Sequence, residues 1–346
     1  MSVFNLRAYD GHEQIVFCSD EKSGLKAIIC IHDTTLGPAV GGCRMWEYNT
    51  DEGALVDALR LSRGMSYKNA LAGLKMGGGK SVIIGNPNTS KSDELFLAFG
   101  RFIESLNGRY ISAEDVGITP QDMAIVNRET NYVVGLEGKS GDPSPVTAYG
   151  VFKGMKAAVK HKLNRDSLDG IKVAVQGAGH VGYYLCKHLA EEGAKIFVTD
   201  INKDSVARVV EDCNATAVDI DDIYTQDVDV YAPCALGATL NNITIPRLKA
   251  SIIAGAANNQ LAEDFHGDAL KKRGILYTPD YVINAGGIIN VNYEDNYDQA
   301  KALSKVDEIY GTLTEIFETA DREHKTTNVV ADSLARNRIL QARKNR

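Results

Sequence analysis

Two lysines beside a run of glycines are the residues of this sequence best suited to acid/base chemistry. Lys80 ends the run GLKMGGGK over 73–80, and Lys68 stands twelve positions earlier. Glycines let the main chain approach a ligand without a Cβ in the way. An ammonium held near another cation in a partly closed cleft loses proton affinity, so a lysine there can act as a base near neutral pH. The pair therefore indicates a site for a small carboxylate with a lysine base, and the alternative is a plain glycine-rich loop.

A second pattern, farther along the chain, predicts a dinucleotide-binding site. An apolar run, 173–176, leads into the sequence GAGHVG over 177–182 and then into an amphipathic stretch, 183–192. In this arrangement the first glycine makes the tight turn, the second admits the pyrophosphate, and the third lets the helix pack on the strand. Asp200 ends the next apolar run, where a carboxylate binds the ribose 2′-hydroxyl and repels a 2′-phosphate. NAD is therefore predicted rather than NADP, and His180 is expected to be a first-turn helix residue without chemistry.

Size and composition indicate a two-domain enzyme. The chain has 346 residues, which is long for a single core, and its net charge of -7 argues against nucleic acid or an anionic membrane as a partner. The amino terminus has no basic region followed by an apolar run, and no apolar segment reaches the roughly 18 residues of a membrane span, so we expect a cytoplasmic protein. Six cysteines without CxxC or zinc-like spacing indicate reduced core thiols. No metal is expected.

The order of elements predicts two α/β domains separated by a cleft. In the first domain, 1–145, Asp115 follows a predicted strand, and strand ends in open α/β sheets face the ligand crevice. The segment 138–145 is rich in Gly, Pro and Ser and is the predicted hinge. In this domain we expect strands at 27–31, 81–84 and 109–112, and helices around 55–68 and 95–106.

The second domain, 146–324, is predicted to be an NAD-binding Rossmann domain with a doubly wound parallel sheet. Beyond the dinucleotide unit, apolar runs at 228–232, 251–254 and 274–277 are its further expected strands. The tail, 299–341, has an apolar stripe at helical spacing and should be nearly all helical. Its last helix, 325–346, is expected to pack back on the first domain, which would serve substrate binding and oligomerisation, or on a neighbouring subunit.

Ordered motifs along nearly the whole chain resemble those of the Glu/Leu/Phe/Val dehydrogenase family. They are LGPAVGG at 36–42, MSYK at 65–68, GGGK at 77–80, AEDVG at 113–117, APCALG at 232–237, ANNQ at 257–260 and VINAGG at 282–287. The resemblance implies reversible oxidative deamination of an L-amino acid to its 2-oxo acid and ammonia, with NAD accepting hydride. It also implies a homo-oligomer, with an octamer favoured and a dimer as the alternative.

The resemblance also implies roles for individual residues. Lys68 matches the lysine that holds the substrate α-carboxylate, Lys80 matches the catalytic lysine that activates water, and Asp115 matches the acid that shuttles protons to and from the amino nitrogen. Without the lysines nearby, Asp115 could equally be a helix-cap or turn residue, and Asn284 either lines the cleft or caps a helix. Gly41 and Gly42 join the substrate site, and the NAD set comprises Thr147, Gly177, Ala178, Gly179, His180, Val181, Gly182, Asp200, Cys234, Ala235 and Asn259.

The positions expected around the substrate side chain are apolar. Members that bind glutamate carry a lysine and a serine where this chain has Val40 and Val291, and Ala113 and Ile288 complete the wall. Burying an unpaired carboxylate there is costly, so the prediction is a branched aliphatic substrate: leucine, valine or isoleucine. Phenylalanine or tryptophan is the alternative, because Val40 is smaller than the Leu frequent at this position and one methylene is worth only about 1–3 kcal/mol. The four residues could also be ordinary core.

Two other functions compete with this prediction. A hydroxy-acid or malic-type NAD dehydrogenase would need a His acid/base group beside an Arg clamp, and no His accompanies Arg44 in such a motif. In a non-catalytic NAD-binding regulator, the two lysines would have only a structural role. The presence of Lys68, Lys80 and Asp115 together argues against this function. The requirement for ammonia distinguishes the three possible functions, because only an amino-acid dehydrogenase needs ammonia to oxidise NADH with a 2-oxo acid.

Overall fold

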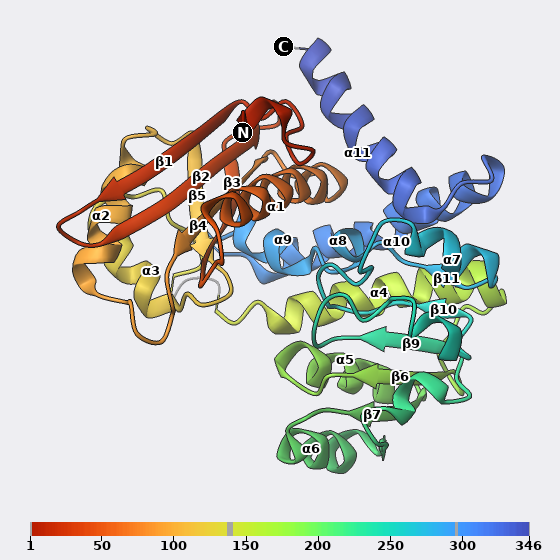
Figure 1. Cartoon of the computed structure of the whole chain (residues 1–346). Coiled ribbons are helices and arrows are strands. Elements are labelled where there is room, and N and C mark those ends of the chain that lie inside the picture. The colour runs from red at the N-terminus through yellow and green to blue at the C-terminus, as the bar shows by residue number, and fades with distance from the viewer. Residues whose placement is uncertain (1, 137–140, 295–296, 346) are drawn as a thin grey trace. The chain divides into compact units, whose positions relative to one another are not determined.

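The computed structural model describes residues 2–136, 141–294 and 297–345, and the chain forms two compact units (Figure 1). The boundary lies between Gly141 and Asp142, a few residues before the expected one. Residues 138–140 of the predicted hinge lie outside the described residues. Unit 1 comprises Met1–Gly141, Val291–Tyr297 and Ala335–Arg346, and unit 2 comprises Asp142–Asn290 and Asp298–Leu334.

Unit 1 is built on a mixed sheet with the strand order β1-β2-β4-β3-β5. β2 is antiparallel to β1 and β4, and β3 is parallel to β4 and β5. Alternation along β2 sends Ile28 toward Leu59 of α1 and Ile29 toward Phe99 of α2, so the two helices cover opposite faces. The elements are β1 Gln14–Asp20, β2 Leu25–Asp33, β3 Ala39–Trp46, α1 Asp51–Leu71, β4 Gly77–Ile84, α2 Asp93–Glu104, β5 Tyr110–Glu114 and α3 Pro120–Val126.

The glycines before Lys80 lie in a strand rather than in a loop. β4 begins at Gly77, so the predicted strand start at Ser81 was wrong. Glycine has a poor strand propensity, but here close packing overrides it. Lys80 shares a strand face with Gly78 and Val82, the face that α1 covers. A Cβ would lie 2.1 Å from Asp33 O at Gly77, 2.1 Å from Ser66 N at Gly78 and 2.7 Å from the Tyr110 ring at Gly79.

Unit 2 holds the predicted doubly wound sheet, with strands in the order β11-β10-β9-β6-β7-β8, all parallel. The chain enters at β6, winds outward through β7 and β8, and returns to the other side through β9. Ligands of such sheets bind at the carboxyl ends of the strands where the winding reverses, here between β6 and β9. The elements are α4 Ser144–Leu163, β6 Lys172–Gln176, α5 His180–Glu191, β7 Lys195–Thr199, α6 Lys203–Cys213, β8 Thr216–Ala217, β9 Val230–Pro233, β10 Ile252–Ile253, α7 His266–Lys272, β11 Leu276–Tyr277 and α8 Asp280–Ile283.

Three helices complete the chain: α9 Gly286–Asn292, α10 Gln299–Arg322 and α11 Thr327–Lys344. α10 packs on α4 through a buried stripe that includes Val306 and Leu313. α11 begins in unit 2, and its residues from Ala335 onward belong to unit 1. None of the helices in the described residues is long and apolar enough to cross a lipid bilayer. All six cysteines are unpaired.

Candidate active site

A buried ion pair joins the two predicted catalytic residues. Lys80 Nζ lies 2.8 Å from Asp115 Oδ2, and Lys80 is only 6% exposed. Asp115 directly follows β5, and the glycine at position 42 of β3 gives it room, because a Cβ there would lie 2.9 Å from the Cβ of Asp115. The structure thus brings together a lysine from β4 and a carboxylate from the end of β5.

Sequence reasoning missed the other members of this charged group. Arg44 Nε donates a hydrogen bond to the same Asp115 oxygen at 3.0 Å, and Arg44 Nη1 donates to Asp57 Oδ2 at 2.9 Å. The Tyr48 hydroxyl donates to that Asp57 oxygen at 2.6 Å. The sequence did contain one signal for Arg44. It stands two residues after Gly42 in the same strand, so the two residues share one face of the sheet.

Asp115 is held in its ionised form. Burial alone would raise the pKa of this carboxyl group, but the charges of Lys80 and Arg44, with their hydrogen bonds, outweigh burial and hold the pKa of Asp115 below its ordinary value of 3.8. Asp115 is therefore a carboxylate across the neutral range. It is suited to accept a proton from an ammonium group.

Lys68 lies on α1, in the last turn before the helix ends at Leu71. The residues near Lys68 in α1 contact β4, the strand that holds Gly77, Gly78 and Gly79. Asn69 Nδ2 donates to Gly77 O at 2.6 Å, and Ser66 packs against Gly78. Lys68 itself is half-buried. The predicted carboxylate lysine and the predicted catalytic lysine therefore belong to the two elements that pack on each other, α1 and β4.

Gly41, Val40 and Ala113 lie beside this contact. A Cβ on Gly41 would lie 1.8 Å from Gly79 O and 3.2 Å from Met65 of α1, so only glycine fits there. Val40 is buried on β3, and Ala113 is half-buried on β5, paired in register with the glycine at position 42. The other two predicted wall residues, Ile288 and Val291, are half-buried on α9.

Two histidines, His12 and His32, form a buried pair against α1. The rings of His12 and His32 have centroids 4.8 Å apart. His32 Nδ1 lies 2.8 Å from Ser66 Oγ, and His12 Nε2 lies 3.1 Å from Ser62 Oγ. Burial first, and the nearby His12 second, lower the pKa of His32 to about 4, and burial also lowers the pKa of His12. Both rings are therefore neutral at pH 7.

The His32 pKa predicts a loss of stability in acid. His32 binds a proton more tightly in the unfolded chain, whose ordinary pKa is 6.5, than in the folded protein. The free energy of unfolding should therefore fall by on the order of 3 kcal/mol as the pH is lowered from 6.5 to about 4. Urea unfolding at several pH values measures this. A His32→Gln variant should show a flatter pH dependence, and an unchanged slope would contradict the assignment.

The glycine fingerprint of unit 2 has the geometry that a dinucleotide needs. Gly177 has a φ of 111°, which favours glycine, and a Cβ on Gly182 would lie 2.0 Å from Gly177 O. Gly179 is exposed, and a Cβ there would meet no protein atom within 4 Å. The first and third glycines are thus required by the fold, while the second faces open space that a pyrophosphate could approach.

The residues next to the fingerprint come from the ends of β6 and β9. A Cβ on Gly177 would lie 2.8 Å from the backbone N of Ala235, so the glycine turn meets the loop that carries Cys234 and Ala235. Val181 lies in the first turn of α5. His180 is exposed and opens α5, and its Nδ1 lies 3.3 Å from Asp142 Oδ2.

Asp200 stands at the carboxyl end of β7 beside this loop. Its Oδ2 accepts the N–H of Ala178 at 2.7 Å. A cavity of about 590 Å³ opens next to it, with Ile201 and Ile220 among its apolar lining residues. Ile201 is 88% exposed, which is unusual for an isoleucine. Sequence reasoning missed this cavity, whose largely apolar lining also carries Lys203, Glu211 and Asp219, and its apolar surface beside Asp200 suits an adenosine.

Two further predicted residues, Asn259 and Asn284, belong to or contact the segment after β10, and a third, Thr147, lies in the first turn of α4. Asn284 Nδ2 donates to Ala256 O at 3.0 Å and to Asn258 Oδ1 at 2.7 Å. Asn259 is exposed and has a φ of 52°. The Thr147 hydroxyl donates a hydrogen bond to Pro143 O, directly before α4, at 3.0 Å. Asn284 Oδ1 is buried and has no hydrogen-bond partner among the described residues, so it is available to a ligand.

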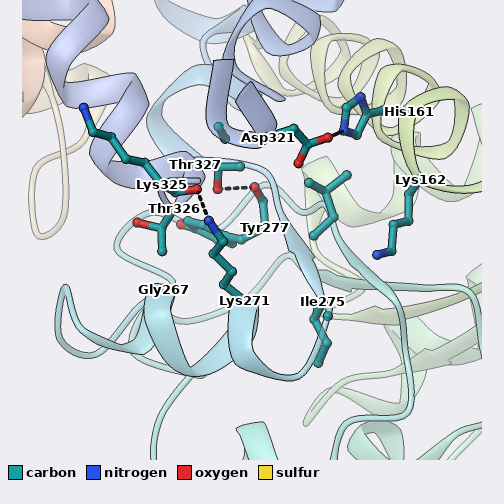
Figure 2. A pocket seen from close by; sticks show the side chains of 13 residues that line it. His161, Lys162, Gly267, Lys271, Ile275, Tyr277, Asp321, Lys325, Thr326 and Thr327 are labelled. Atoms are coloured by element: carbon teal, nitrogen blue, oxygen red, sulfur yellow. Dashed lines mark hydrogen bonds and ion pairs between the residues drawn. The ribbon is translucent and has the colours of Figure 1, made fainter. Parts of the chain in front are cut away.

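A second cavity of unit 2, of about 420 Å³, lies outside the predicted site (Figure 2). His161 Nε2 lies 3.0 Å from Asp321 Oδ2, and Lys271 Nζ donates to the carbonyl of Lys325 at 2.7 Å. None of the predicted site residues lines it. Because these polar groups already have protein partners, the cavity indicates no ligand.

Comparisons with known proteins agree on one family. Residues 12–132 match the model described as Glu/Leu/Phe/Val dehydrogenase, dimerisation domain, and residues 138–202 and 198–344 match the model for Glutamate/Leucine/Phenylalanine/Valine dehydrogenase. A leucine dehydrogenase of Bacillus subtilis (strain 168) is 59% identical over 350 residues, which cover 100% of this chain and 96% of that protein. One from Geobacillus stearothermophilus is 58% identical over 345 residues, which cover 99% and 94%.

A solved structure agrees as well. The crystal structure of L-tryptophan dehydrogenase from Nostoc punctiforme superposes with a TM-score of 0.87 at 52% identity and covers 96% of this chain and 97% of that one. These matches confirm the resemblance that the sequence motifs indicated and the two-domain α/β fold. The chain belongs to the Glu/Leu/Phe/Val dehydrogenase family and is an amino-acid dehydrogenase.

Proposed function

We propose that this protein catalyses the NAD-dependent, reversible oxidative deamination of leucine, valine or isoleucine to the 2-oxo acid and ammonia. The buried Lys80–Asp115 ion pair is the observation that supports the chemistry most directly. A lysine and an ionised carboxylate in contact can supply a base and a proton shuttle at one carbon atom. The regulator hypothesis would give this buried charged group no task.

The residues of unit 1 divide the work of the reaction. Lys68 holds the substrate α-carboxylate, and Asp115, ionised in the free protein, takes a proton from the substrate amino group. Lys80 activates the water that attacks the iminium carbon and supports the carbinolamine that follows. Asp115 then returns a proton to the amino nitrogen, and Lys80, which has released the proton of the attacking water to solvent, takes the proton of the carbinol hydroxyl as ammonia leaves and the 2-oxo acid forms. When bound, NAD accepts the hydride from Cα.

The residues of unit 2 fit NAD. The exposed Gly179 leaves room for the pyrophosphate, Asp200 would take the ribose hydroxyls, and the cavity beside it would take the adenine. Thr147 and Asn259 would hold the nicotinamide end, and Asn284 belongs to the predicted substrate-binding residues.

The proposed substrate class follows from the uncharged wall. Val40, Ala113, Ile288 and Val291 offer no partner for a side-chain carboxylate, which argues against glutamate. Two relatives at 58–59% identity are leucine dehydrogenases, which supports an aliphatic substrate. The L-tryptophan dehydrogenase at 52% identity supports the alternative, the same reaction on an aromatic amino acid.

A panel of L-amino acids tests the proposal by the appearance of NADH absorbance at alkaline pH. We expect fast turnover of leucine, valine and isoleucine, and little of glutamate or phenylalanine. A preference for phenylalanine or tryptophan would leave the proposed mechanism unchanged but would overturn the proposed substrate class. No turnover of any amino acid would overturn the proposed function and favour a regulator.

Asp200 should determine the choice of cofactor. Replacing it with serine removes the acceptor for the ribose hydroxyls and the charge that repels a 2′-phosphate, so we expect NADH affinity to fall about tenfold and NADPH affinity to rise. Fluorescence titration with both cofactors measures this. Asp212, which accepts the Tyr183 hydroxyl at 2.7 Å, offers the matched control, and Asp212→Ser should leave both affinities unchanged. Equal effects of the two substitutions would contradict the role of Asp200.

We also propose a homo-oligomer, because the family model over residues 12–132 is described as a dimerisation domain. The resemblance favours an octamer, with a dimer as the alternative, and analytical ultracentrifugation distinguishes them. The cytoplasmic location stays a prediction from the sequence.

A further inference from the structure

The carboxyl end of α1 is capped by α11, a helix that lies far away in the sequence. Arg338 Nη1 donates to Ala70 O at 3.2 Å and to Leu71 O at 3.0 Å. These carbonyls belong to the last turn of α1, and Ala70 O also accepts the N–H of Gly73 at 3.2 Å, so Arg338 adds to the backbone's own capping of this turn. A cation at this end also offsets the negative pole of the helix dipole. Arg338 therefore stabilises the final turn of α1.

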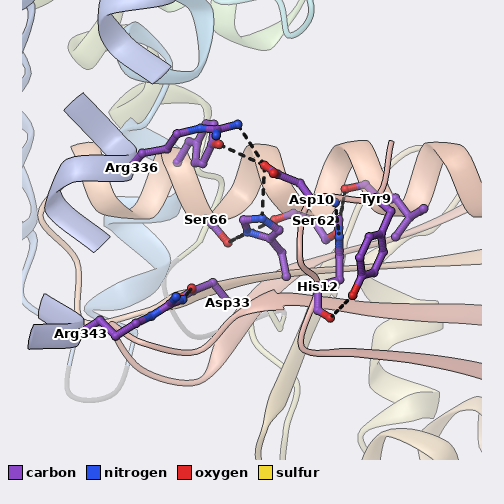
Figure 3. Close-up of polar contacts among 11 residues, drawn as sticks. Tyr9, Asp10, His12, Asp33, Ser62, Ser66, Arg336 and Arg343 are labelled. Atoms are coloured by element: carbon purple, nitrogen blue, oxygen red, sulfur yellow. Dashed lines mark hydrogen bonds and ion pairs between the residues drawn. The ribbon is translucent and has the colours of Figure 1, made fainter. Parts of the chain in front are cut away.

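A second arginine of α11, Arg336, contacts the residue before Lys68. Arg336 Nη2 donates to Asp10 Oδ2 at 3.1 Å, and its guanidinium lies 5.7 Å from the centroid of the Tyr67 ring. Figure 3 shows Arg336 reaching toward Asp10. The Tyr67 hydroxyl donates to that oxygen at 3.4 Å. Lys68 directly follows Tyr67, so α11 contacts the chain before Lys68 and after it.

β4 holds the opposite side of the last turn of α1. Asn69, which is fully buried, donates to Gly77 O at 2.6 Å. The backbone that carries Lys68 is thus held between β4 on one side and α11 on the other. β4 is the strand that carries Lys80, so the position of this turn sets where Lys68 can reach relative to Lys80.

We propose that Arg338 is a positioning residue for Lys68, and through Lys68 for the α-carboxylate of the amino acid. The inference rests on the proposed carboxylate role of Lys68. Arg338 acts through the backbone of α1, because it donates hydrogen bonds to two carbonyl groups of that helix. Small displacements of a positioning group cost binding and rate, so loosening this turn should weaken substrate binding first.

Arg343 provides a matched control on the same helix. Its Nη2 donates to Asp33 Oδ2 at 2.5 Å, at the end of β2 (Figure 3). It therefore fastens α11 to unit 1 with the same type of side chain, through Asp33 of β2 and Thr35 of the adjoining loop rather than through α1. Arg343→Met should cost stability without moving Lys68.

The experiment compares Arg338→Met, Arg338→Lys, Arg343→Met, Lys68→Met and the double variant Lys68→Met/Arg338→Met in the full-length protein. KM for the amino acid, kcat, NADH affinity and thermal unfolding are measured for each. For Arg338→Met we expect KM to rise about tenfold, with kcat and NADH affinity within about threefold of the parent. Arg338→Lys should recover part of the loss, and Arg343→Met should keep KM within about twofold. In the double variant, KM should be no higher than in Lys68→Met alone, because both changes remove one interaction.

Two results would overturn the positioning role. They are an equal rise of KM in Arg343→Met, or effects of Lys68→Met and Arg338→Met that multiply in the double variant. If Arg338→Met does not fold, Arg338→Lys and Arg338→Gln carry the test, and an unchanged KM in both would overturn the proposal. A Lys68→Met variant with unchanged KM would instead overturn the carboxylate role of Lys68, so the two failures are distinguishable.

Discussion

Replacing Lys80 with alanine should lower kcat by about 10³-fold or more while leaving NADH affinity within about twofold. The substitution removes the group proposed to activate water and the partner of Asp115 at 2.8 Å. The glycine fingerprint lies in unit 2, so cofactor binding should persist. Initial rates by NADH absorbance and a fluorescence titration with NADH measure the two quantities.

Lys91 supplies a matched control for this variant. It is also a partly buried lysine of unit 1 that forms an ion pair, with Asp122 at the start of α3. Lys91→Ala removes a comparable charge pair away from the site, so kcat should stay within about twofold. Retained turnover in Lys80→Ala, or an equal loss in Lys91→Ala, would contradict the catalytic role of Lys80.

Asp115→Asn is expected to lower kcat by about 10²- to 10⁴-fold, because the amide keeps the shape but cannot take a proton from the amino group. Asp57→Asn tests whether catalysis depends on the whole charged group or on Asp115 in particular. Asp57 accepts from Arg44 Nη1, whereas Asp115 accepts from Arg44 Nε and pairs with Lys80, so the loss of kcat in Asp57→Asn should be at least about tenfold smaller. Rates of both variants across alkaline pH check this, and equal losses would argue that the whole group, rather than Asp115, is required.

The glycine turn of unit 2 could be predicted from the sequence because its requirements are local. Gly177, Gly182 and Asp200 lie within one strand–helix–strand unit, and each position is set by a turn, a close approach or a strand end. The doubly wound sheet followed from the same local repeats of apolar runs and helical stripes. These features need no knowledge of distant parts of the chain.

Unit 1 was harder to predict because its packing is long-range. The glycines of β4 appear loop-like in the sequence, and only the approach of Ser66 and Tyr110 explains why a strand must be made of them. The Arg44–Asp115 bond joins residues 71 positions apart, and Arg338 caps a helix 267 positions away. No local periodicity encodes such pairs. Lys68, Lys80 and Asp115 were found through their motifs, and their partners were not.

α1 emerges as the element on which the substrate half of the site depends. It covers the face of the sheet that carries Lys80, contributes Asp57 to the charged group, and carries Lys68 in its final turn. The buried His32 contacts it through Ser66. Changes that loosen α1 should therefore affect catalysis even where they touch no substrate.

Ammonia dependence tests the central claim most directly. NADH oxidation is followed with 4-methyl-2-oxopentanoate, the 2-oxo acid of leucine, with and without ammonium chloride, and with sodium chloride as the control for ionic strength. The proposed function predicts oxidation that requires ammonium and stops in Lys80→Ala. Oxidation without ammonium would contradict it and indicate a hydroxy-acid dehydrogenase, and no oxidation in either case, with NADH still bound, would favour a regulator.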